Sequence, residues 1–62
     1  MKVSQLLHVM DKDDDIIIED ESTIYKGEVR GIKRDDPINR MHVDHVFACD
    51  NKMFVLVKGG AE

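Results

Sequence analysis

Two segments of this 62-residue chain are apolar at every position, residues 16–18 and residues 53–57. Their β-branched, aromatic and leucine side chains favour strands. Consecutive side chains of a strand point to opposite faces, so both segments present apolar side chains on both faces of a sheet. Burial of each Ile, Leu or Phe side chain contributes about 1.5–3 kcal/mol. A stable fold must therefore cover both faces of that sheet.

The chain is too short to bury a large core. A core of this size rarely supplies more than about 3–5 kcal/mol without further support. The lone cysteine, Cys49, cannot form an intrachain disulfide, and the sequence has no multi-cysteine zinc pattern. We therefore predict a homodimer that self-associates through Ile17, Phe54 and Leu56. The alternative is a curled sheet that hides these side chains together with a helix of the same chain.

The N-terminal segment has the spacing of a short amphipathic helix. Val3, Leu6, Leu7 and Met10 recur at the helical period. Ser4 is the predicted N-cap, because its hydroxyl can accept from the free N–H groups of the first turn. A helix this short is marginal by itself, so we expect it to pack on the sheet.

Four strands are predicted, at residues 16–18, 23–32, 41–49 and 52–58, with an irregular segment at residues 33–40 and a tight turn at residues 50–51. In the third strand the alternation slips, which indicates either a bulge near Asp44 and His45 or an inward His45. Gly27 and Gly31 suit a sharply bent second strand. The predicted fold is α+β, a short N-terminal helix followed by a four-stranded antiparallel, strongly bent meander or small barrel. It forms one small domain of residues 1–58 with a flexible tail at 59–62.

Composition excludes several classes of protein. The chain is 42% hydrophobic and 35% charged, which is typical of a folded domain. It contains neither an apolar run of about 18–20 residues nor a signal-peptide core, so we expect a cytoplasmic protein with no membrane partner. The net charge of −4 and the scarcity of aromatic residues speak against direct nucleic-acid binding.

Carboxylates dominate residues 11–21, which we call the acid strip. The strip begins like a calcium loop, but Ile16 stands where that loop needs glycine and Ser22 where it needs glutamate. One interpretation is a solvated connection that keeps the chain soluble. The other is mimicry of nucleic-acid phosphates toward a basic host protein. The candidate residues for that partner are Asp13, Asp14, Asp15, Glu19, Asp20 and Glu21.

Basic residues gather in the middle of the chain. Lys26 belongs to the second predicted strand, and the candidate binding residues are Arg30, Lys33, Arg34 and Arg40. Such a patch can hold a phosphate or a small nucleotide. The alternative is ion pairing with the acid strip of the same or a neighbouring subunit.

Metal or catalytic chemistry has one candidate, the set of His42, Asp44, His45 and Cys49. On a regular strand His42 and His45 point to opposite faces, so they can share an ion only across a bulge. Cys49 is interpreted as a small buried apolar side chain. The chain has no glycine-rich phosphate loop and no nucleophile elbow. We therefore predict no enzyme activity, with no catalytic residue, no metal and no cofactor.

Two partial resemblances follow from residues 16–18 and from residues 24–29, Ile-Tyr-Lys-Gly-Glu-Val. These segments resemble the first two strands of Sm-like small β-barrels, which implies a bent small barrel. A predicted helix is followed by the pattern Ile-Tyr-x-Gly-x-Val. In this arrangement, most of the chain is similar to short, acidic, uncharacterised phage and prophage proteins of Gram-positive bacteria. This second resemblance implies an accessory protein that inhibits a host defence enzyme or sequesters its nucleotide signal.

The sequence as a whole predicts a non-catalytic small binding or assembly module that acts as a homodimer through protein–protein contacts. The alternative is a phage-type inhibitor of a host defence system, which acts by acidic nucleic-acid mimicry or by nucleotide sequestration.

Overall fold

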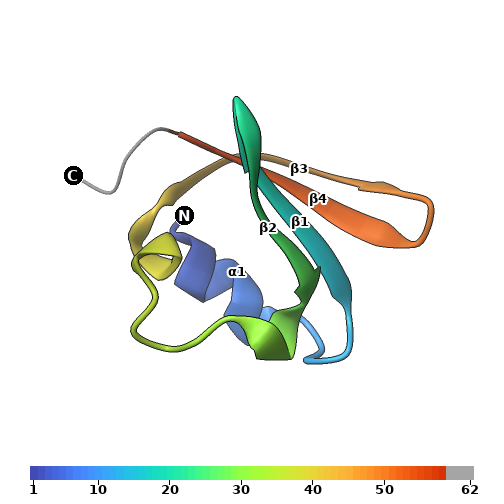
Figure 1. Cartoon of the computed structure of the whole chain (residues 1–62), viewed down its shortest axis with the longest axis horizontal. Coiled ribbons are helices and arrows are strands. Elements are labelled where there is room, and N and C mark those ends of the chain that lie inside the picture. The colour runs from blue at the N-terminus through green and yellow to red at the C-terminus, as the bar shows by residue number, and fades with distance from the viewer. Residues whose placement is uncertain (59–62) are drawn as a thin grey trace.

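A computed structural model of the chain describes residues 1–58. It contains the helix α1 (Val3–Val9) and the strands β1 (Asp15–Asp20), β2 (Ser22–Glu28), β3 (His42–Cys49) and β4 (Lys52–Lys58). Two short 3₁₀ helices, η1 (Val29–Gly31) and η2 (Pro37–Arg40), lie between β2 and β3. The predicted α+β class is confirmed (Figure 1). The predicted tail at residues 59–62 lies outside the described residues, and the single-domain boundary stays a prediction.

The sheet is mixed, with the strand order β2-β1-β4-β3. β1 and β4 are parallel, whereas each outer strand pairs antiparallel with its inner neighbour. The predicted antiparallel meander is therefore wrong. The two strands that are apolar on both faces take the two central positions, where parallel pairs are normally buried. Two hairpins, β1–β2 and β3–β4, thus lie side by side in one sheet, joined by the parallel pairing of β1 with β4 (Figure 1).

The hydrophobic core lies between α1, the two 3₁₀ helices and one face of the sheet. Val3 of the helix is fully buried against this face, and Leu6, Leu7 and Met10 pack at its margin as the helical spacing predicted. The other buried core residues are Ile16, Ile18, Val29, Ile38, Val55 and Val57. This face of the sheet is therefore covered by the chain itself.

The N-terminus of the helix differs from the prediction. The helix begins at Val3, and its Lys2 N–H donates to the Gln5 Oε1 atom at 2.8 Å, so Ser4 is not the cap. Backbone contacts explain the earlier start. The Val3 N–H donates to the Met41 carbonyl at 2.9 Å, which ties the helix start to the entry of β3.

The bulge and the tight turn of the second hairpin are confirmed. The register of β3 shifts between Val43 and His45, so that Val43 and Val46 both face the core. Asp50 and Asn51 have φ angles of 52° and 62°. Positive φ at two successive residues matches the type I′ turn that joins twisted antiparallel strands.

Gly27 and Gly31 make room for the Tyr25 side chain. The Tyr25 hydroxyl donates to the Glu28 carbonyl at 2.6 Å, where the chain leaves β2 and enters η1. A Cβ atom at Gly27 would lie 3.1 Å from the Tyr25 hydroxyl oxygen, and one at Gly31 would lie closer still. The glycines thus allow one tyrosine ring to close the end of the β1–β2 hairpin.

A Gly31→Ala substitution is expected to lower the free energy of unfolding by about 1–3 kcal/mol, because the added methyl group overlaps the Tyr25 hydroxyl. Urea denaturation measures this loss. Tyr25→Phe alone should cost about 1 kcal/mol through its lost hydrogen bond. In that background Gly31→Ala should cost much less, since the next ring atom lies 3.4 Å away. Equal losses in both backgrounds would contradict this account.

Candidate functional site

The face of the sheet opposite α1, which we call the open face, is the first candidate site. Within residues 1–58 no helix lies over it (Figure 1). Ile17 lies opposite Phe54 on the neighbouring strand, and Phe54 lies opposite Phe47. Leu56 lies two residues beyond Phe54 on the same face, because strand side chains alternate. The structure therefore brings together Ile17, Phe54 and Leu56, the residues predicted for self-association.

Burial differs among these side chains. Ile17 is only 8% exposed, so the single chain already buries it. Phe54 and Leu56 are half-buried, whereas Phe47 is 42% exposed. The rings of Phe47 and Phe54 stack with centroids 5.1 Å apart and planes 4° apart. Sequence reasoning missed Phe47, which lies opposite Phe54 because the two-residue turn at Asp50 and Asn51 sets this part of the hairpin register.

The charges around this apolar centre are balanced. By register, Lys26, Lys52 and Lys58 occupy open-face positions, and so do Asp15, Glu19 and Glu28. The bases thus equal the acids in number. This local balance differs from the chain as a whole, which has a net charge of −4.

The bulge also places His42 and His45 on the open face, in register with Lys58 and Leu56. Cys49 lies on the same face and is exposed, so its predicted burial is wrong. It is exposed because β3 is an edge strand and Cys49 is its last residue. Within residues 1–58 no three His, Cys, Asp or Glu side chains converge well enough to hold a metal ion.

The acid strip is divided by the three buried isoleucines of β1. One cluster precedes the buried isoleucines, where Asp14 Oδ2 accepts from the Asp11 N–H at 3.1 Å and Asp13 forms an ion pair with Arg30. The Asp15 side chain is exposed at the first residue of the strand. The other cluster follows the isoleucines and consists of Glu19, Asp20 and Glu21, where Glu19 accepts a 3.4 Å hydrogen bond from Thr23.

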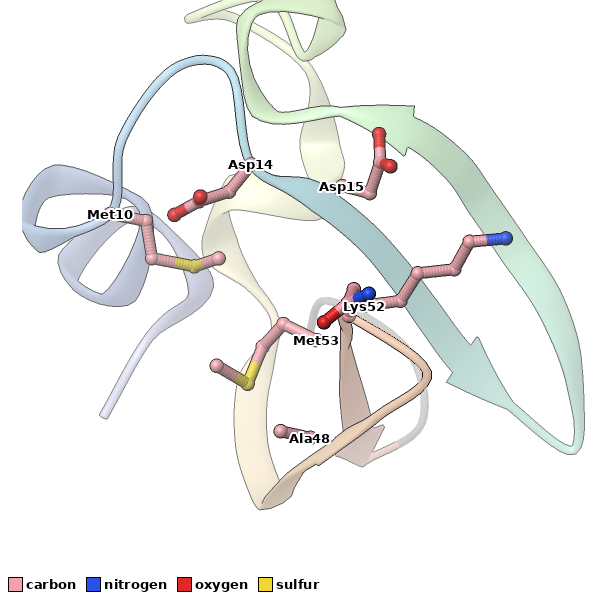
Figure 2. Close-up of a pocket in the computed structure, with 7 residues that line it drawn as sticks. Met10, Asp14, Asp15, Ala48, Lys52 and Met53 are labelled. Atoms are coloured by element: carbon pink, nitrogen blue, oxygen red, sulfur yellow. The ribbon is translucent and has the colours of Figure 1, made fainter.

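A small cleft lies between the end of α1, the start of β1 and the turn between β3 and β4. Met10, Asp14 and Met53 line it, and Lys52 extends from it toward β2 (Figure 2). Its volume is about 150 Å³. Sites for small molecules usually measure about 300–1,000 Å³, so this cleft is too small to be one.

A larger groove, which we call the basic groove, lies between α1, η1 and the segment that leads to η2. Its volume is about 640 Å³. Arg30 and Arg34 line it, as do Lys12 and His8. Lys33 and Arg40, the other predicted basic candidates, are not among its lining residues.

Sequence reasoning missed Lys12 and His8 for different reasons. Lys12 stands among the aspartates of the acid strip, far along the chain from the other bases. His8 follows Ser4 by four residues on α1, and both side chains line the groove. The i, i+4 spacing of Ser4 and His8 could have predicted that both side chains lie on the same face of the helix.

Backbone and side-chain hydrogen bonds hold the walls of the basic groove. The Asn39 side-chain amide donates to the carbonyl oxygens of Lys33 at 2.7 Å, Arg34 at 3.1 Å and Asp36 at 3.2 Å. On the opposite wall the Arg30 N–H donates to the Lys12 carbonyl at 3.1 Å. The loop that carries Lys12 is thereby tied to η1.

Comparison with protein-family models, with curated proteins and with solved structures finds no match to this chain. Within the described part of the chain, no helix is long and apolar enough to cross a membrane.

An Asn39→Ala substitution is expected to lower the free energy of unfolding by about 1–2 kcal/mol, because the carbonyl groups of the Arg34 loop lose their shared donor. Hydrogen exchange of the Asp36 amide, which donates to the Lys33 carbonyl, should accelerate. Arg40→Ala, at the exposed neighbouring position, is the matched control. An Asn39→Ala variant as stable and as slow to exchange as this control would contradict the role of Asn39.

Proposed function

We propose that the chain is a non-catalytic, cytoplasmic binding and assembly module that acts as a homodimer through its open face. The observation that carries this proposal is the stacked pair of Phe47 and Phe54, which lies over β3 and β4 on a sheet face that no described helix covers.

A second copy related by a two-fold axis would place this apolar centre against itself. In such an arrangement each copy covers the other's Phe47, Phe54 and Leu56. Phe47 would bury the most additional apolar surface, because it is 42% exposed in the single chain. Full burial of a Phe or Leu side chain contributes about 1.5–3 kcal/mol, and these residues are only partly exposed, so each gains a fraction of that.

The charge pattern favours a second copy over a strongly acidic or basic partner. Lys26, Lys52 and Lys58 are matched by Asp15, Glu19 and Glu28 around the same centre. A self-complementary surface needs both signs of charge, so that bases of one copy can meet acids of the other. A nucleic acid or a basic protein would instead meet a face of little net charge.

The edges of the sheet are less suited to association. The hairpin of β1 and β2 has a register irregularity between Ile18 and Glu19, and edge strand β3 has its bulge between Val43 and His45. Bulges interrupt the regular row of free N–H and C=O groups that strand addition requires. The open face is therefore the better surface for a second copy.

The alternative function, a phage-type inhibitor that presents the acid strip to a basic host protein, stays a prediction. The buried isoleucines of β1 divide that strip into two clusters, and Asp13 is already paired with Arg30. No contact among the described residues favours this alternative over assembly.

The Phe47→Glu variant is expected to be monomeric at concentrations at which the wild-type chain is a dimer. A charged side chain at this position cannot be buried against its symmetry mate without a large loss of solvation. Light scattering at a low and a high protein concentration measures the change.

Val9→Glu is the matched control, because Val9 is 77% exposed on α1, away from the open face. This control should dimerise like the wild type. A wild-type chain that stays monomeric at both concentrations would overturn the proposed function.

A further inference from the structure

We propose that the basic groove binds a small phosphate-bearing molecule about as large as a mononucleotide. The groove lies on the α1 side of the sheet, so this binding does not depend on the homodimer proposed for the open face. Three features of the groove favour such a ligand: the charges of its rim, the apolar residues of its floor and the hydrogen bonds that hold both in place.

Three separate segments each contribute a cation to the rim. Lys12 comes from the loop after α1, Arg30 from η1 and Arg34 from the loop before η2. No carboxylate is among the residues that line the groove, although the chain has more acids than bases. Charge-assisted hydrogen bonds to phosphate oxygens are about twice as strong as neutral ones. The rim therefore favours a compact anion such as a phosphate group.

The floor indicates that the ligand has an apolar or planar part as well. Leu7, Met10, Val29 and Ile32 line the groove beside the cations. The volume of about 640 Å³ lies within the range of about 300–1,000 Å³ that is typical of small-molecule sites. An inorganic phosphate ion would leave most of this space to water, whereas a mononucleotide would extend over both rim and floor.

The Arg30 side chain and the backbone that carries Arg34 are held before any ligand arrives. Arg30 forms an ion pair with Asp13, and its Nε lies 3.5 Å from Glu28 Oε1. A guanidinium has five N–H donors, so these two carboxylates orient Arg30 and still leave donors for a phosphate. The Arg34 loop is fixed by the amide of Asn39. Less conformational freedom is then lost on binding.

The two carboxylates beside Arg30 also weaken the local positive charge. Lys12 and Arg34 are therefore the cations whose charge is least compensated, and Arg34 is the better test because its fork can hold two phosphate oxygens. Binding should weaken as the salt concentration rises, since the rim is open to solvent.

Isothermal titration calorimetry of the full chain with AMP, adenosine and inorganic phosphate tests the proposal. AMP should bind at least about tenfold more tightly than either fragment, because only AMP engages both rim and floor. In NMR spectra the AMP-induced shifts should include Leu7, Met10 and Ile32. Phosphate that binds as tightly as AMP, or AMP without measurable binding, would overturn the proposed ligand class.

Arg34→Gln should weaken AMP binding about fivefold to tenfold, which corresponds to the loss of one charge-assisted contact at an exposed site. Arg40→Gln is the matched control, because Arg40 is a nearby exposed arginine outside the groove. Its AMP affinity should equal that of the wild type. Equal losses in both variants would mean that AMP responds only to total charge, and would overturn the assignment of the site.

Discussion

The parallel pairing of β1 with β4 is the constraint on which the rest of the structure depends. Ile16, Ile17 and Ile18 lie beside Met53, Phe54 and Val55 in register, so the two strands that are apolar on both faces share the centre of the sheet. Parallel pairs need a long connection, and the chain provides one through β2, the two 3₁₀ helices and β3. That path carries η1 and η2 across one face only. The face covered by α1 and the open face both follow from this pairing.

The two faces of the sheet have different chemistry. On the α1 side the helix and the 3₁₀ helices bury the core and leave a groove whose rim is basic, although the chain as a whole is acidic. On the open face a stacked aromatic pair is surrounded by equal numbers of acids and bases. The proposed dimer surface and the proposed anion groove therefore lie on opposite sides of the sheet, so occupation of one would leave the other open.

Local sequence patterns predicted the secondary-structure elements but not the order of the strands in the sheet. The helix, four strands, the bulge of β3 and the turn at Asp50 and Asn51 follow from residues that are close in sequence. The bounds of the second strand differ from the prediction, because β2 ends at Glu28 and the chain forms η1 where the strand was expected to continue to residue 32. Which strands are neighbours depends on long-range burial. The sequence pattern therefore predicts apolar side chains on both faces of residues 16–18 and 53–57, but not the central position of β1 and β4 in the sheet. The sequence predicted the two arginines of the basic groove but not its lysine. Arg30 and Arg34 belong to one basic segment, whereas Lys12 joins them only through the backbone tie between its loop and η1.

In the proposed homodimer, a second copy covers the face opposite α1. The most direct test of this arrangement is an isotope-filtered nuclear Overhauser experiment on a mixture of labelled and unlabelled chains, which detects contacts between copies alone. We predict intermolecular contacts from the rings of Phe47 and Phe54 and from the methyl groups of Leu56. Intermolecular contacts confined to α1, or none at a concentration where the spectra are otherwise complete, would contradict the account.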